Sequence, residues 1–300
     1  MGNLRAPLEE ESRQSLDGPG APGFPGGARE RESPAESGYN RPDMPRLARI
    51  FIYPIKSFDG MAVDEARVLP SGALEHDRRF ALFDAEGQVL NGKRTPDMHH
   101  LRSRFDLEAG RVSLSGGGRS GDFSLTADRG QIEEWLATFS GLPVRLEENA
   151  TSGFPDDTVA PGPTVVSAAT LAEVSSWFDE LALEEIRRRF RANLIVDGVD
   201  PFWEDRLYSE EGQFVRFQVG DVTFEGVYPC QRCVVPTRGS ETGERYHDFT
   251  RLFEARRYET LPYWATRSRF DHFYRLAVNT RPVAGATGTI HVGDEVRIVE

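Results

Sequence analysis

Cysteine is nearly absent from this sequence: the 300 residues include only Cys230 and Cys233. Two cysteines in a chain of this length exclude a disulfide framework and indicate a reducing compartment. The sequence also lacks any apolar run near the ~20 residues that are needed to span a bilayer. No apolar segment of the signal-peptide type follows Met1. These absences predict a soluble, cytoplasmic protein with no membrane span.

Positive charge is scarce as well. Lysine and arginine number 36 against 48 aspartates and glutamates, which gives a net charge of −12. Because phosphate backbones are bound by basic surfaces, this balance argues against a nucleic-acid partner and equally against an anionic membrane surface. The apolar fraction of 38% is typical of a globular protein. The length suffices for one large domain or two modest ones.

Residues 1–45 differ in composition from the rest. They are rich in proline, glycine and charge, and the stretch from Leu16 onward contains no β-branched residue. Such a segment cannot bury enough apolar surface to offset the entropy lost on ordering. We therefore expect residues 1–45 to be a disordered tail.

Short apolar segments separated by turn signals fill residues 46–300. This pattern predicts a mostly β fold with a few helices (α+β), built as barrels or sandwiches. Helices are expected over 131–139, capped by Asp128, and from an N-cap at Ser167 to about residue 187. The loop composition of 148–163 predicts a boundary between one domain over 46–150 and another over 151–300. Strands are expected over 47–53, 62–69, 80–83, 89–90, 105–107, 112–114, 144–146 and 164–166, and within 191–198, 214–220, 221–229 and 287–299.

Both cysteines lie in one stretch, Phe224 to Glu244 (FEGVYPCQRCVVPTRGSETGE). A structural zinc ion needs about four ligands, and His247 is the only histidine nearby. A thioredoxin-type pair needs its first cysteine at the start of a helix, whereas Val-Val-Pro follows Cys233. Two interpretations remain open on these residues alone. One is a pair of small apolar side chains buried at a strand end, and the other is a thiolate that Arg232 helps to keep ionised.

Several polar residues have plain structural explanations when each is taken alone. Lys56 and Arg78 are typical of surface charges, and Arg191 follows an arginine cluster that matches the C-terminus of a helix. His99-His100 has no set of partner residues and is interpreted as loop. Glu204-Asp205 is expected to position a strand connection rather than to perform acid-base catalysis.

Six short motifs occur in order along the chain. Each is weak by itself, but the ordered set is specific, and it covers residues 46–300. The motifs are Tyr53-Pro54-Ile55-Lys56-Ser57, Asp77-Arg78, Phe190-Arg191-Ala192-Asn193, Pro201-Phe202-Trp203-Glu204-Asp205, Cys230-Gln231-Arg232-Cys233 and Gly288-Thr289-Ile290-His291-Val292-Gly293-Asp294.

This set resembles the MOSC superfamily, and most closely the branch that includes the mitochondrial amidoxime-reducing component and related bacterial proteins. The resemblance implies a MOSC N-terminal β-barrel module over 46–150, followed by a MOSC β-barrel domain over 151–300. One position differs from the family pattern. Ala192 stands where the F-R-P-N motif often has proline, which loosens the backbone without removing a polar group.

The resemblance implies a molybdenum cofactor (molybdopterin), with the thiolate of Cys233 as metal ligand and catalytic residue. Arginine offers a bidentate fork to phosphate and lysine a point charge, which suits the cofactor's phosphate. Ser167, at the start of its expected helix, is a further candidate through backbone donors. The cofactor-binding residues implied by the motif match are Lys56, Ser57, Arg78, Arg191 and Asn193.

The implied function is an oxidoreductase that reduces N-hydroxylated or related N-oxygenated small molecules. The chain has no ferredoxin-like cysteine cluster and no flavin or haem motif. Electrons are therefore expected from separate proteins, such as a ferredoxin, a flavoprotein or a cytochrome b5-like protein. One alternative is sulfur transfer through a persulfide on Cys230 or Cys233. No separate pyridoxal-phosphate domain, the partner domain in cofactor sulfurases, fits in this length. The other alternative is a non-catalytic cofactor carrier.

Overall fold

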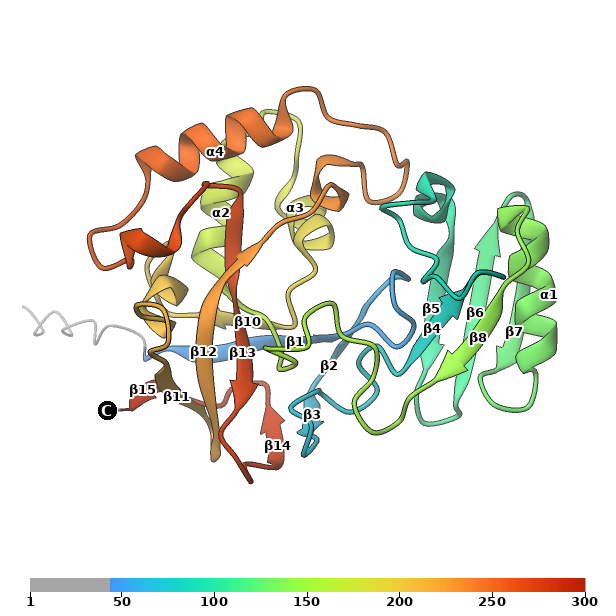
Figure 1. The fold of residues 1–300 in the computed structure, drawn as a ribbon, viewed down its shortest axis with the longest axis horizontal. Coiled ribbons are helices and arrows are strands. Elements are labelled where there is room, and N and C mark those ends of the chain that lie inside the picture. Colours follow the sequence, from blue (N-terminus) through green and yellow to red (C-terminus); the bar gives the residue numbers. More distant parts are fainter. Residues whose placement is uncertain (1–43, 300) are drawn as a thin grey trace, which may run out of the picture. The chain divides into compact units, whose positions relative to one another are not determined.

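The computed structural model describes residues 44–299. Strands dominate this range, and four α-helices and several 3-10 segments accompany them, which confirms the expected fold class (Figure 1). The expected disordered tail lies, up to residue 43, outside the described residues. No helix within the described range is long and apolar enough to cross a membrane.

The elements alternate irregularly between strand and helix. The strands are β1 (Arg46–Ile52), β2 (Met61–Val63), β3 (Glu65–Val68), β4 (Phe80–Phe83), β5 (Arg102–Asp106), β6 (Arg111–Gly116), β7 (Arg119–Ser124), β8 (Arg145–Glu148), β9 (Val165–Ser167), β10 (Leu194–Asp197), β11 (Val215–Val219), β12 (Val222–Gln231), β13 (Arg275–Pro282), β14 (Gly288–His291) and β15 (Val296–Val299). The helices are α1 (Arg129–Ser140), α2 (Ala168–Ser176), α3 (Leu183–Phe190) and α4 (Phe249–Glu259), with 3-10 segments η1 (Pro96–His100), η2 (Trp203–Leu207), η3 (Val235–Thr237) and η4 (Arg267–Arg269).

The largest sheet has eight strands in the order β15-β11-β12-β13-β9-β10-β1-β2. Its neighbours are antiparallel except β9 and β10, which run parallel and are joined through α2 and α3. Such a crossover is what parallel neighbours require. β3 pairs with β14 outside this sheet, and one bridge between Arg46 and Glu295 links the start of β1 to the segment before β15. Within residues 44–299, the pairings do not close into a complete barrel.

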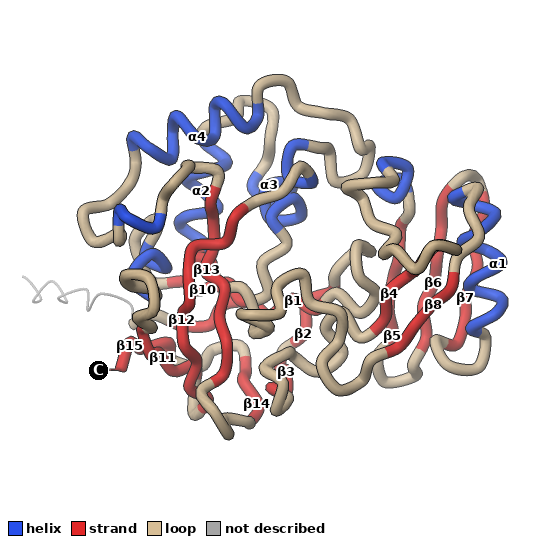
Figure 2. The backbone as a smooth tube through the Cα atoms, in the orientation of Figure 1, coloured by secondary structure: helices blue, strands red, loops and turns tan. Residues whose placement is uncertain are grey.

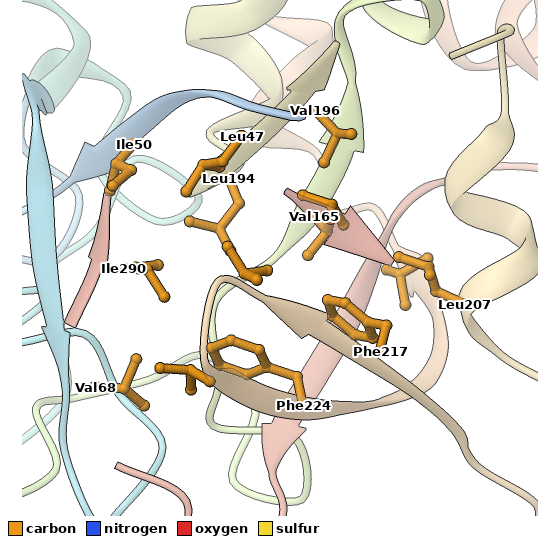
Figure 3. Packing of buried hydrophobic residues seen from close by; sticks show 14 of the residues in the cluster. Leu47, Ile50, Val68, Val165, Leu194, Val196, Leu207, Phe217, Phe224 and Ile290 are labelled. Atoms are coloured by element: carbon orange, nitrogen blue, oxygen red, sulfur yellow. The ribbon is translucent and has the colours of Figure 1, made fainter. Parts of the chain in front are cut away.

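Each face of the large sheet has its own core, because successive residues of a strand point to opposite faces. Leu194 and Val196 on β10 belong to one cluster, and Ile195 between them belongs to the other. Figure 3 shows the first cluster, which unites Leu47 of β1 with Phe224 of β12. In the second cluster, side chains of α2, α3 and α4 pack against residues of β1, β10 and β13, and Figure 2 shows these three helices gathered together.

A smaller group of elements has a third core, made by residues between 55 and 146. It contains the two-stranded sheet β4-β8 and the three-stranded sheet β5-β6-β7, drawn in cyan and green in Figure 1. Helix α1 packs Ile132, Trp135 and Leu136 into this core, as their helical spacing predicted. Asp128 precedes α1 as expected, but its carboxylate accepts the N–H of Ser124 and does not cap the helix.

The first strands of the chain join the larger core. Leu47 and Ile50 of β1, together with Val68 of β3, pack with residues of the C-terminal half. Phe51 and Tyr53 belong to the second cluster, so residues 46–150 contribute to all three cores. Loop composition located the irregular segment near residue 150, but it carries no information on which core a strand joins.

One expected helix is two helices. The helix predicted from Ser167 to about residue 187 ends at Ser176, and a second helix begins at Leu183. Phe178 and Leu181 lie in the connection between them and are buried, as predicted for their side chains. The sequence period located the apolar positions correctly. The break arises because the chain turns between the two helices while both side chains stay in the core.

Candidate cofactor site

A cavity of about 730 Å³ is lined by strands and loops of the smaller group, by α3 and by the end of β12. Its lining is basic although the chain is acidic. Eleven lysine and arginine residues line it against seven aspartates and glutamates. A local excess of cations in a concave site attracts anions, and a cavity of this volume is of the size that binds small molecules.

The structure brings six of the seven predicted site residues to this cavity. Ser167 is the exception. It is fully buried and caps α2 by accepting the N–H of Thr170, while its own N–H donates to the carboxylate of Glu204. The start of α2 is therefore directed at a buried carboxylate. The six residues that line the cavity are Lys56, Ser57, Arg78, Arg191, Asn193 and Cys233.

The two thiols lie where the ladder between β12 and β13 loses its regular register. The register shifts at Cys230, opposite which β13 carries Ala277 with a left-handed φ of 67°. A bulge of this kind re-aims side chains next to functional sites. Both Cys230 and Cys233 are free and half-buried, and both line the cavity.

Arg232 is the neighbour of Cys233 in sequence, but it contacts Cys230. Its Nη1 donates to the sulfur of Cys230 at 3.2 Å, and its Nη2 donates to the carbonyl of Phe190. The sulfur of Cys233 accepts only a long hydrogen bond from the N–H of Val235, at 3.5 Å, among the described residues. Cys233 is therefore the less engaged of the two thiols and the one better able to bind a soft metal.

Lys56 is tied to the loop that follows β8. Its Nζ donates to the carbonyls of Phe154 at 2.9 Å and Pro155 at 3.2 Å, and it pairs with Asp156 at 3.0 Å. Burial would raise the pKa of Asp156, but Lys56, and after it Arg78, outweigh burial and lower that pKa to about 2. The carboxylate of Asp156 therefore takes the place beside Lys56 that an anionic ligand would occupy.

Arg78 is oriented by a carboxylate and an amide. It forms an ion pair with Asp77, and its Nη1 donates to Oδ1 of Asn193 at 3.3 Å. Asn193 is 1% exposed, donates its Nδ2 to the carbonyl of Phe51 and accepts from the N–H and hydroxyl of Thr164. The hydrogen bonds of Asn193 are thus made within the protein. Its side chain contacts Arg78 in the wall of the cavity.

Three residues of this cavity have a left-handed backbone: Ser57 with φ 73°, Arg78 with φ 49° and Arg191 with φ 53°. Only seven non-glycine residues in the described chain have a positive φ. The left-handed region costs a residue with a Cβ about 1–2 kcal/mol, and such strain concentrates at functional sites. The concentration here supports the view that this backbone is shaped for a ligand.

Arg191 ends α3 and places its guanidinium over the ring of Tyr53, 4.0 Å from the ring centroid. Burial lowers the pKa of Arg191, Tyr53 raises it, and repulsion by Arg78 lowers it again. No carboxylate of residues 44–299 lies within ion-pair distance of Arg191. Because an arginine pKa starts above about 12, the group stays charged. Asp59 and Asp156 attract it only from beyond ion-pair distance, so within the described part of the chain it is a cation without a direct counter-ion.

His99, Arg102 and Arg238 are among the cavity residues that the sequence reasoning did not select. His99-His100, expected as loop, ends the 3-10 segment η1. Burial and then Arg238 lower the pKa of His99, which favours the neutral ring at neutral pH, and its Nε2 has no hydrogen-bond partner among the residues that the structure describes. Arg102 donates to the carbonyl of Ser240, 138 residues away in sequence. No local pattern signals a meeting of segments so far apart.

The residues of the cavity fit a pterin cofactor that brings its own metal ligands. Among residues 44–299, no group of three or more histidine, cysteine or acidic residues could hold a metal ion by itself. A metal at Cys233 would therefore need ligands from a bound organic group, such as a dithiolene. Buried polar atoms are nearly always hydrogen-bonded, so unpaired ones in the lining favour a polar ligand. These atoms are Nε2 of His99, Nε of Arg188, Nε of Arg232, Nε of Arg238 and Oδ1 of Asn279.

These features define a mostly β protein in which one cavity joins a free thiol to a basic wall. Two family models match the chain: the MOSC N-terminal beta barrel domain over residues 44–181, and the MOSC domain over residues 163–297. The chain belongs to the MOSC domain family, with the family's N-terminal domain ahead of the MOSC domain.

Named relatives of the chain include molybdenum cofactor sulfurases. The enzyme of Drosophila mojavensis is 27% identical over 231 residues, which are 67% of this chain and 29% of that protein. The human enzyme is 26% identical over 260 residues, 70% of this chain and 28% of that protein. The chain thus spans less than a third of the length of these relatives.

Solved structures give a weaker likeness. A hypothetical protein is 12% identical with a TM-score of 0.38, covering 86% of this chain and 69% of that one. The YUAD protein from Bacillus subtilis is also 12% identical, with a TM-score of 0.33, covering 84% of this chain and 94% of that one.

Proposed function

We propose that the cavity binds a molybdenum cofactor through the thiolate of Cys233, and that the protein reduces N-hydroxylated or related N-oxygenated small molecules. The observation that carries this proposal is the juxtaposition in one cavity of a weakly engaged thiol and the guanidinium of Arg191, which has no ion pair within residues 44–299. A soft thiolate suits molybdenum, and a guanidinium suits the phosphate of the pterin.

The chain's own residues would divide the work of binding. Cys233 would hold the metal, while Arg78 and Arg191 would hold the phosphate. Lys56 and the backbone at Ser57 would contact the same, phosphate-bearing end of the ligand. The bound group would supply the two-electron chemistry at the metal. Reduction of an N–O bond also consumes two protons and releases water, so the substrate end of the cavity must admit both.

Electrons would come from a separate donor protein, such as a ferredoxin, a flavoprotein or a cytochrome b5-like protein. The proposed setting is the cytoplasm, whose reducing conditions keep both thiols free. In that arrangement the present chain contributes the cofactor site and the substrate cavity.

Sulfur transfer is the second candidate, and two observations favour it. The named relatives are cofactor sulfurases, and Cys230 is engaged by the cationic Arg232. In this role a separate donor would leave a persulfide sulfur on Cys230 or Cys233, which would then pass to an acceptor. A non-catalytic cofactor carrier would use the same cavity without turnover.

The test is metal and pterin analysis of the full chain, purified from a host that makes the cofactor. Wild type should carry near-stoichiometric molybdenum and pterin, and should reduce an amidoxime with an artificial electron donor. Cys233→Ser should lose the metal and the activity while keeping the fold, and Cys230→Ser is the matched control expected to retain metal. Molybdenum without turnover would identify a carrier. A folded wild type with neither molybdenum nor pterin would overturn the proposal, and a persulfide on either cysteine by mass spectrometry would then support sulfur transfer.

A further inference from the structure

The ring of Tyr53 carries two guanidinium groups. The guanidinium carbons of Arg191 and Arg78 lie 4.0 and 5.1 Å from its centroid. An arginine over a tyrosine ring is attracted by the negative face of the π system. All three residues line the cavity. The ring therefore gathers two positive charges at one place in the wall.

The ring itself is firmly seated. Tyr53 is 2% exposed, its N–H donates to Asp77 at 2.9 Å and its hydroxyl donates to the carbonyl of Ala192 at 3.4 Å. Gly60 completes the seat, because a Cβ there would lie only 2.4 Å from Cε1 of the ring. A ring held at its backbone, its hydroxyl and one edge keeps its position before any ligand arrives.

The two guanidiniums need such a support because they repel each other. Arg78 has Asp77 as its counter-ion. Within residues 44–299, Arg191 has no carboxylate at ion-pair distance. The ring of Tyr53, 4.0 Å from the guanidinium carbon, is the group in direct contact with Arg191 that offsets this repulsion, and Asp59 and Asp156 add a weaker attraction from farther away. Among residues 44–299, no hydrogen bond or ion pair of its side chain holds Arg191 beside Arg78, so the ring is what positions it.

We propose that Tyr53 is a positioning residue, which holds Arg78 and Arg191 together as a binding site for a phosphate monoester. Two guanidinium forks on one ring can donate to several oxygens of a phosphate, and Arg191 adds a positive charge that no carboxylate of the described residues pairs with. On the proposed function, which this inference deepens, the phosphate is that of the bound cofactor. The effect of the ring on anion binding does not depend on molybdenum.

The experiment is a calorimetric titration of inorganic phosphate into the full chain, with two substitutions of Tyr53. Tyr53→Phe keeps the ring and loses only the hydroxyl, so phosphate should bind within about twofold of wild type. Tyr53→Leu removes the ring and should weaken phosphate binding by about tenfold, the scale of a desolvated cation–π contact. Rescue by phenylalanine assigns the effect to the ring and not to the hydroxyl.

Two further variants keep the test decisive. Phe58→Leu removes another buried ring from the same turn, one that has no guanidinium over it among the described residues. It should lower stability and leave phosphate affinity unchanged. If Tyr53→Leu does not fold, Gly60→Ala replaces it. The added methyl must displace the ring of Tyr53 and should weaken phosphate binding severalfold.

Three outcomes would overturn the inference: a Tyr53→Leu protein that binds phosphate as wild type does, a Tyr53→Phe protein as weak as Tyr53→Leu, or a wild type that binds no phosphate. Molybdenum loading separates this failure from that of the proposed function. If wild type loads molybdenum and Tyr53→Leu binds phosphate normally, only the positioning role of Tyr53 is refuted. If the phosphate affinities follow the expected order but wild type carries neither molybdenum nor pterin, only the proposed cofactor is refuted.

Discussion

Lys56 and Asp156 form an ion pair in which Nζ lies 3.0 Å from Oδ1. The pair joins the turn after β1 to the loop after β8. Its two members differ in exposure: the side chain of Lys56 is 12% exposed and that of Asp156 is 63% exposed. The carboxylate is therefore the partner that can move away, and an anion that enters the cavity must compete with it.

Asp156→Asn should strengthen the binding of inorganic phosphate by about threefold. The substitution removes an anion that competes for Lys56, and an exposed ion pair is worth about 0.2–1 kcal/mol. The pKa of Asp156 is depressed to about 2, so the carboxylate is ionised at all ordinary pH values. The gain in the variant should accordingly be equal at pH 5 and pH 8, measured by calorimetry. Asp97→Asn, at an exposed position of η1, is the control for net charge, and equal affinities in both variants would refute the competition.

Glu204 should make the protein less stable as the pH rises. It is 1% exposed, and burial, followed by repulsion from Asp205, raises its pKa to about 7. A raised pKa means that the folded state holds the proton to higher pH than the unfolded state does. The resulting stability is complete below the unfolded pKa of about 4.3 and is lost as the pH passes through 7.

Glu204→Gln tests this dependence through the free energy of unfolding in urea at pH 5 and pH 8. The neutral amide removes the titration, so the free energy of the variant relative to wild type should rise by about 2–3 kcal/mol between the two pH values. Glu180→Gln, on the exposed segment after α2, should show no such change. A flat difference for both variants would mean that Glu204 is ionised in the fold at pH 5.

Gly226→Ala should destabilise the protein by about 3 kcal/mol, the upper range for overpacking. A Cβ at Gly226 would lie 1.7 Å from the carbonyl oxygen of Leu207, so β12 and η2 must separate. Gly130→Ala is the matched control, because nothing lies within 4 Å of its added Cβ in α1. It should stabilise the helix by about 0.5–1 kcal/mol. Thermal unfolding measures both, and similar midpoints for the two variants would contradict the clash.

The sequence predicts the parts of this fold that depend on local pattern. The apolar run of Leu194 to Val196 predicts a strand, and Ser167 predicts the cap of a helix; both are present. The break after Ser176 could not be predicted, because Phe178 keeps the apolar spacing of a helix while the chain turns. The pairing of β1 with β10 was also beyond reach, since register between distant strands is set by the whole sheet.

The candidate site was predictable as a set of residues but not as an arrangement. The motif match selects Lys56, Arg78 and Arg191, which line one cavity. It does not reveal that Lys56 is already paired, or that Arg232 contacts Cys230 and not its neighbour. Those facts depend on backbone directions at turns and bulges. Residue types alone do not encode them.

The pairing of early with late strands has a consequence for biosynthesis. β4 to β8 find their partners among themselves, so that group can fold soon after the ribosome has made it. One edge of β1 stays unpaired until β10 has been synthesised. β3 stays unpaired until β14 has been synthesised, and these two strands are more than 200 residues apart. Long-range pairing is slow, and unpaired apolar strands invite aggregation. During translation the nascent chain therefore displays the open edge of β1 until its partner emerges, which makes this strand a natural substrate for a chaperone.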